Sequence, residues 1–154
     1  MEWTAHCDGS AVPNPGRMAY GAVLVSPAGE RFTLSCTTHR IGCNNEAELV
    51  ALLAVLAELE RHGARAAVVF TDNSVLVAQL GDGADAPPAI ARLADLFAEA
   101  RRALARFDRV RLQWVPRHRN QEADALARAA QGLAPKSTAL PRSRRAIKAR
   151  RRSG

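Results

Sequence analysis

The sequence predicts an α/β protein in which a mixed sheet of five strands carries helices on both of its faces. Three features support this fold class. Short apolar or alternating segments, typical of strands, dominate the first forty residues. A long amphipathic segment at 44–62 and a short apolar one at 66–71 then follow, in the strand–helix–strand order that gives parallel strands. We therefore expect three antiparallel strands and, beside them, two parallel ones.

The composition is that of an ordinary globular protein. The 154 residues are 47% hydrophobic, which suits one domain with a sizeable core. No segment approaches the ~20 apolar residues of a membrane span, and the N-terminus lacks the basic-then-apolar pattern of an export signal. The three cysteines form no C-x-x-C pair. We therefore expect reduced thiols, a cytoplasmic location and no contact with membranes.

The positive charge is concentrated near the end of the chain. Segment 133–154 carries eight basic residues and no acidic one, whereas the whole chain is +7, so that residues 1–132 sum to −1. The basic segment has too few apolar residues to pack. We expect a folded domain at 1–132 and a disordered, phosphate-seeking tail at 133–154. The alternative is a tail that only keeps the chain in solution.

The first three strands are predicted at 3–7, 18–26 and 31–38. Asp8, Gly9 and Ser10 follow the first of them, and a Pro/Gly loop at 13–16 comes next. Gly9 lets another group approach the backbone closely, because it has no side chain. The second and third strands flank a tight turn, so we expect an antiparallel hairpin.

The segment at 44–62 is the clearest helix, since its leucines recur at helical spacing and form one stripe. Asn45 can cap its start and Gly63 can end it. The remaining elements are predicted as a strand at 66–71, helices at 74–80 and 89–106, a strand at 109–115 and a helix at 121–131.

Four carboxylates stand where predicted elements meet. Asp8 ends the first strand, and Asp72 ends the fourth. Glu48 and Asp124 lie in the first turns of the long helix and of the last helix. If the two strands are parallel neighbours, Asp8 and Asp72 share the carboxyl edge where α/β sheets hold ligands. Carboxylates gathered there repel one another, and Mg²⁺ or Mn²⁺ would neutralise them better than zinc, because hard cations prefer oxygen ligands.

Three of these acids also have a purely structural interpretation. Glu48 completes a capping-box pattern that starts at Asn45. Asp72 is a candidate N-cap of the helix that follows it. Asp124 lies where the positive end of a helix favours acidic residues. Local capping does not explain Asp8, nor the gathering of all four acids at one edge.

Four segments form a recognisable set. They are DGS-x₃-NPG from Asp8, CNNEAELVALLAVL from Cys43, TDNS from Thr71 and WVPRHRNQEADALA from Trp114. In this order, over roughly residues 1–131, they resemble type-1 ribonuclease H, in the short branch found in archaea and actinobacteria. The resemblance implies the ribonuclease H-like fold and a catalytic domain at 1–132. It also implies metal-dependent hydrolysis of the RNA strand of RNA–DNA hybrids, leaving 5′-phosphate and 3′-hydroxyl ends, without an obligate protein partner.

The resemblance further implies roles for individual residues. Two Mg²⁺ ions, with Mn²⁺ as a possible substitute, would share Asp8 as a bridge. Asp124 would help to hold the ion that activates the attacking water. Glu48 and Asp72 would support the ion that faces the leaving 3′-oxygen. His118 falls where the family often has a mobile histidine that assists proton transfer or product release. The residues expected to contact the hybrid are Gly9, Ser10, Asn14, Asn44, Asn45, Asn73, Arg117 and Arg119.

The sequence departs from the better-known bacterial members at three places. The loop between His118 and Asp124 is shorter than usual, which leaves an ordinary solvent-facing histidine as the alternative. Segment 81–88 stands where many members carry a basic protrusion, yet it contains two aspartates and no basic residue. Asn73 follows Asp72 where serine is commoner.

Two other functions remain open at this point. The first is a nucleic-acid-binding module that kept the fold and is catalytically weak or inactive, although the presence of all four acids disfavours it. The second is a related nuclease with another substrate, such as a resolvase or a transposase-type enzyme. The asparagines and the NPG loop are unfavourable to that alternative.

Overall fold

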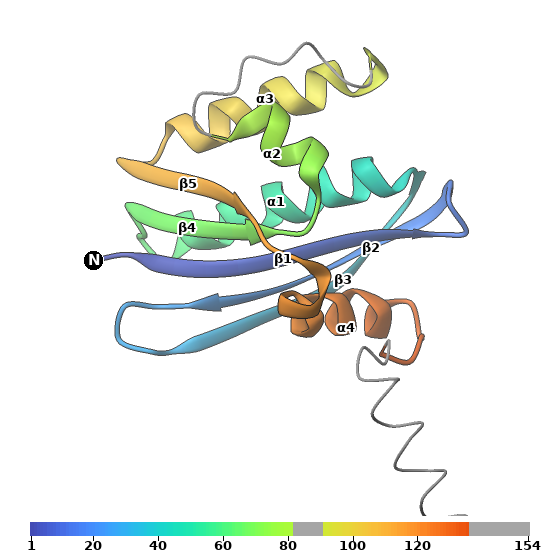
Figure 1. The fold of residues 1–154 in the computed structure, drawn as a ribbon, viewed down its shortest axis with the longest axis horizontal. Coiled ribbons are helices and arrows are strands. Elements are labelled where there is room, and N and C mark those ends of the chain that lie inside the picture. Colours follow the sequence, from blue (N-terminus) through green and yellow to red (C-terminus); the bar gives the residue numbers. More distant parts are fainter. Residues whose placement is uncertain (82–90, 136–154) are drawn as a thin grey trace, which may run out of the picture.

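Five strands form one mixed sheet in the order β3-β2-β1-β4-β5 (Figure 1). The strands are β1 (Trp3–Val12), β2 (Gly16–Val25), β3 (Arg31–Gly42), β4 (Ala66–Thr71) and β5 (Arg109–Trp114). Neighbours are antiparallel from β1 to β3, whereas β4 is parallel to β1 and β5 is parallel to β4. The predicted sheet is confirmed. These observations come from a computed structural model that describes residues 1–81 and 91–135.

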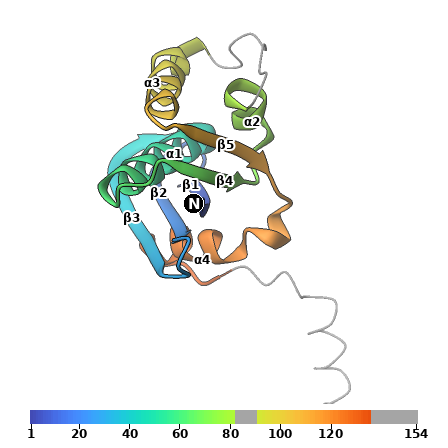
Figure 2. The same cartoon turned by 90° about the vertical axis from the view of Figure 1, so that its left-hand side faces the viewer.

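Helices cover both faces of the sheet, as predicted (Figures 1 and 2). They are α1 (Asn44–Arg61), α2 (Ser74–Leu80), α3 (Ala94–Ala105) and α4 (Gln121–Ala130), with 3-10 turns η1 (Ala91–Leu93) and η2 (Arg117–Arg119). On one face α1 packs against β1, β2 and α3. On the other face α4 packs against β1, β2 and β3. Among the described residues, no helix is long and apolar enough to cross a membrane.

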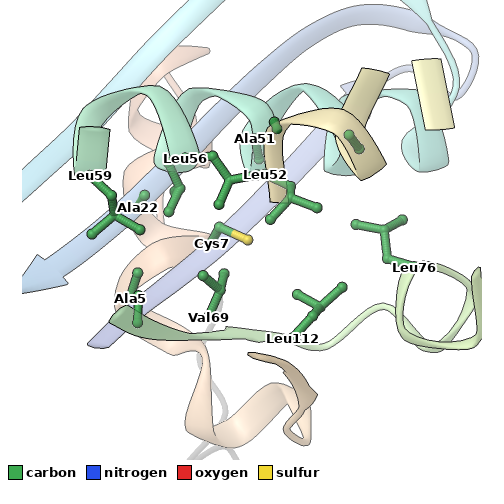
Figure 3. Close-up of a cluster of buried hydrophobic side chains, with 14 of the residues drawn as sticks. Ala5, Cys7, Ala22, Ala51, Leu52, Leu56, Leu59, Val69, Leu76 and Leu112 are labelled. Atoms are coloured by element: carbon green, nitrogen blue, oxygen red, sulfur yellow. The ribbon is translucent and has the colours of Figure 1, made fainter. Parts of the chain in front are cut away.

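The leucine stripe of α1 forms the centre of the core. Leu52, Leu56 and Leu59 are fully buried and point toward small or β-branched side chains of the sheet, such as Cys7 and Val69 (Figure 3). Each buried leucine stabilises the fold by about 1.5–3 kcal/mol relative to an exposed one. This packing fixes the rotation of α1 about its axis, and therefore fixes where the polar residues of its first turn point.

The first strand is longer than predicted, so Asp8 lies within β1 and not at its end. The parallel pairing with β4 stops at His6↔Phe70. The antiparallel pairing with β2 continues through Asp8↔Gly21 to Val12. Asp8 therefore lies just beyond the part of β1 that pairs with β4, beside the segment that follows β4. Strand β3 is also longer than predicted, because its pairing with β2 continues to Gly42.

The start of α1 also differs from the prediction. Its N-cap is Cys43, whose Sγ accepts a hydrogen bond from the backbone N–H of Glu46 at 3.4 Å, and Asn45 lies inside the helix. In the predicted helix at 89–106, the described part is η1 followed by α3. The acidic loop expected at 81–88 lies from residue 82 onward outside the described residues, and the basic tail does so from residue 136 onward.

Gly21 allows α4 to lie directly on β2. A Cβ atom at this position would stand 2.4 Å from the backbone oxygen of Ala123 and from the backbone nitrogen of Ala127. Because both atoms belong to the helix backbone, no side-chain rotation can relieve the clash.

We predict that Gly21→Ala lowers the free energy of unfolding by roughly 1–3 kcal/mol, the usual cost of overpacking. Urea denaturation of the wild-type and variant chains measures this loss. An unchanged midpoint would mean that α4 does not rest on β2 as described.

Candidate active site

Three carboxylates from different elements converge at the carboxyl end of β4. Asp8 comes from β1, Glu48 from the first turns of α1, and Asp72 follows β4 directly. Carboxylate oxygens of the three residues lie within 4.8 Å of one another. Asp8 and Glu48 are each only 6% exposed, and Asp72 is half-buried. The shared edge that the sequence suggested for Asp8 and Asp72 is therefore present.

Asp124, in the first turn of α4, lines the same cleft as these three residues. Four carboxyl groups that share one cleft repel one another when they are ionised, so protons or cations are needed to neutralise some of them.

The same conclusion follows from the pKa values. Burial raises the pKa of Asp8 from 3.8 to about 8, and the nearby charges of Asp72 and Asp124 raise it further, against the effect of the hydrogen bond with Glu48. Burial also raises the pKa of Glu48 well above its usual range, with Asp8 as the next cause. Two buried acids with raised pKa values, beside two further carboxylates in one cleft, are typical of a functional site.

Gly9 allows the close approach of β1 and α1 that brings Glu48 to Asp8. A Cβ atom on Gly9 would lie 2.2 Å from the backbone oxygen of Ala47. The Gly9 backbone lies close enough to Glu48 to lower the pKa of this carboxyl group, against the effect of burial. The close approach expected of Gly9 is thus present, and the partner is the first turn of α1.

The structure decides between the two interpretations of Glu48 and Asp72. Cys43, not Asn45, caps α1, and Glu48 faces the other carboxylates from the buried side of the helix. The N-cap of α2 is Asn73, whose Oδ1 accepts hydrogen bonds from the backbone N–H groups of Val75 and Leu76. The capping interpretation is therefore wrong for both acids.

Asn120 is a residue of the site that the sequence analysis missed. It is 1% exposed, and its Nδ2 donates to the backbone oxygen of Cys7 at 2.9 Å and to Oδ2 of Asp72 at 3.4 Å. It thus links the start of α4 to β1 and to the carboxylate cluster. Its only sequence signal, a polar residue directly before a helix, is the signal of an ordinary N-cap.

The carboxylates line a cleft of about 370 Å³. The predicted contact residues that also line it are Gly9, Ser10, Asn44, Asn45, Asn73 and Arg117. Ser74 and Gln121 line it as well, without having been predicted.

Three of the predicted residues do not line this cleft. Asn14 lies beside it, where its Oδ1 accepts a hydrogen bond from the backbone N–H of Asn44. Arg119 lines a separate cavity on the α4 side of the sheet, together with His6. His118 is exposed in η2, and its backbone oxygen accepts a hydrogen bond from Gln121.

The donor set of the site fits a hard divalent cation. Oε2 of Glu48 is buried and has no hydrogen-bond partner among residues 1–81 and 91–135. Buried oxygens without a partner are costly unless something neutralises them. Since the ligand atoms are carboxylate oxygens, the cluster suits Mg²⁺, Mn²⁺ or Ca²⁺ better than a softer metal.

Comparison with known proteins gives consistent results. The model of the family described as "Reverse transcriptase-like" matches residues 6–130. The chain is 34% identical over 142 residues to the "Bifunctional protein Rv2228c" of Mycobacterium tuberculosis, covering 90% of this chain and 38% of that protein. It is 35% identical over 123 residues to "Ribonuclease HI" of Halobacterium salinarum, covering 80% of this chain and 61% of that protein. The chain thus spans less than two thirds of the length of each relative.

Solved structures agree with this. RNase H1 of Halobacterium salinarum superposes with a TM-score of 0.78 at 33% identity, covering 86% of this chain and 98% of that one. LC11-RNase H1, solved in complex with an RNA/DNA hybrid, gives a TM-score of 0.73 at 25% identity, covering 83% of this chain and 95% of that one. The chain belongs to the ribonuclease H family, as its sequence motifs indicate.

The raised pKa of Asp8 predicts an unusual pH dependence of stability in EDTA. Because Asp8 titrates near 3.8 when unfolded and at about 8 when folded, the native state keeps a proton that the unfolded chain loses. Stability therefore falls as the pH rises between these values. We predict that Asp8→Asn weakens this fall and stabilises the metal-free chain at pH 8 by at least about 1 kcal/mol.

Urea denaturation in EDTA at pH 5 and pH 8 measures the effect. Glu99→Gln, on the exposed side of α3, is the control for the loss of one negative charge. An Asp8→Asn chain that is less stable than wild type at pH 8 would show that the Asp8 carboxylate supports the fold.

Proposed function

We propose that residues 1–132 form a metal-dependent endonuclease domain that hydrolyses the RNA strand of RNA–DNA hybrids and leaves 5′-phosphate and 3′-hydroxyl ends. The observation that carries the proposal is the convergence of Asp8, Glu48 and Asp72 in a cleft whose other wall is lined by asparagines. The match to Ribonuclease HI and the likeness to a family member solved with a hybrid support the choice of substrate.

The residues that would hold divalent ions, most suitably Mg²⁺ with Mn²⁺ as a substitute, are Asp8, Glu48, Asp72 and Asp124. Bound there, such ions lower the pKa of an attacking water and neutralise charge on the scissile phosphate. Asp8 would be the central ligand, because Glu48, Asp72 and Asp124 all influence the pKa of its carboxyl group. Asn120 keeps Asp72 oriented toward the cluster through its side-chain amide.

Polar side chains around the carboxylates would position the hybrid. Asn44 and Asn45 lie at the start of α1, and Arg117 lies in η2 at another wall of the cleft. A guanidinium suits a backbone phosphate, because its planar donors match the phosphate oxygens. His118, the next residue of the exposed turn η2, would assist proton transfer to the leaving oxygen if it swings toward the cleft.

A cleavage assay tests the proposal directly. We expect the chain to cut a labelled RNA–DNA hybrid in Mg²⁺ or Mn²⁺ and to be inactive in EDTA. Single-stranded RNA, RNA duplex and DNA duplex should remain intact. Asp8→Asn should abolish cleavage, by at least roughly 1000-fold, while hybrid binding persists, because the change keeps the shape of the side chain and removes its charge.

Glu99→Gln is again the matched control and should cleave at the wild-type rate. Cleavage by Asp8→Asn at the wild-type rate would contradict the assignment of the metal ligands. Wild-type binding to the hybrid without any cleavage would indicate instead a nucleic-acid-binding module of the same fold.

A further inference from the structure

Asn73 carries out two structural tasks with the two ends of its side-chain amide. The oxygen, Oδ1, accepts hydrogen bonds from the backbone N–H groups of Val75 and Leu76, at 2.8 and 3.1 Å, and so caps α2. A backbone N–H can only donate, so the orientation of the amide is determined by its partners. The nitrogen of Asn73 must therefore point away from the helix.

That nitrogen determines the orientation of Asn45. Nδ2 of Asn73 donates to Oδ1 of Asn45 at 2.8 Å. The oxygen of Asn45 is thereby held toward Asn73, and its own NH₂ group is left at the cleft, which both residues line. The orientation of Asn45 thus traces back, through Asn73, to the backbone of α2.

Two further asparagines are oriented in the same sense. The backbone N–H of Ala11 donates to Oδ1 of Asn44 at 2.8 Å. The backbone N–H of Asn44 donates to Oδ1 of Asn14 at 3.1 Å. Within residues 1–81 and 91–135, the NH₂ groups of Asn14, Asn44 and Asn45 have no hydrogen-bond acceptor, whereas all three oxygens are engaged. Asn44 and Asn45 line the cleft and Asn14 lies beside it, so this wall of the cleft offers donors.

We propose that Asn73 is a positioning residue, which locks Asn45 so that its NH₂ group faces hydrogen-bond acceptors of the bound nucleic acid. The inference rests on the proposed function and identifies the kind of nucleic-acid atom that this wall of the cleft would bind. Uncharged acceptors fit such donors, and a hybrid offers them as ribose 2′-oxygens and as the O2 and N3 atoms of bases in the minor groove. Asn73 thus acts through Asn45, and its own contact with the hybrid stays a prediction.

Serine at this position would perform only one of the two tasks. Its hydroxyl oxygen caps a helix as well as asparagine does. A hydroxyl can donate as well as accept, but while its oxygen caps α2 serine lacks the longer amide NH₂ group that reaches the oxygen of Asn45. Asn73→Ser therefore separates the positioning of Asn45 from the capping of α2.

A double-mutant cycle tests the proposal. We expect Asn73→Ser to leave the melting temperature and kcat close to wild type and to raise KM for the hybrid about 2- to 12-fold, the range of one neutral hydrogen bond. In an Asn45→Ala background, Asn73→Ser should add no further increase in KM, because its target is gone. Asn73→Ala, which also loses the cap, is the control and should lower the melting temperature.

Two results would overturn the proposal. An equal rise in KM in both backgrounds would mean that Asn73 acts on the hybrid without Asn45. A loss of kcat at constant KM would mean that Asn73 acts on the carboxylate cluster, to which its neighbour Asp72 belongs.

A second measurement does not depend on nuclease activity. In NMR spectra of the free chain, the side-chain amide of Asn45 should shift in Asn73→Ser, while that of Asn14 should not. If this shift occurs and the wild-type chain nevertheless fails to bind or cleave a hybrid, the proposed function fails while the positioning stands. Without the shift, the positioning role itself is wrong.

Discussion

The crowding of three carboxylates within 4.8 Å is the constraint on which the rest of this site depends. Burial and mutual repulsion raise the pKa values of Asp8 and Glu48, so the cluster opposes folding wherever these groups are ionised. Packing elsewhere holds them together. The leucine stripe of α1 fixes the helix against the sheet, Gly9 admits its first turn, and Asn120 links α4 to β1.

Much of the fold could be predicted from local patterns. The leucine spacing predicts the helix α1, and the short apolar segment after it predicts the strand β4. Together they predict the crossover between β1 and β4. The position of Asp8 within β1 could not be predicted, because it depends on how far β2 continues to pair after β4 has ended. Cys43 was missed as an N-cap because a thiol is a weak acceptor, outside the usual set of capping residues.

The candidate site could likewise be predicted from the sequence only in part. Asp8, Glu48 and Asp72 could be proposed from sequence because each stands at a junction of elements, and junctions on one sheet edge meet in space. Arg117 and Arg119 look equivalent in the sequence, yet the turn of η2 directs the first to the cleft and the second to the cavity beside His6. The orientation of Asn45 depends on Asn73, a contact across 28 positions that no local pattern encodes.

We propose that this carboxylate cluster binds divalent cations, and the proposed function depends on that binding. The most direct test is the melting temperature of the full chain against Mg²⁺ concentration at constant ionic strength, with Glu48→Gln alongside. Because a ligand that binds only the native state stabilises it by mass action, the wild-type melting temperature should rise steadily with Mg²⁺, and that of Glu48→Gln should rise much less. An equal response of the two chains, or no response of the wild type, would contradict the claim.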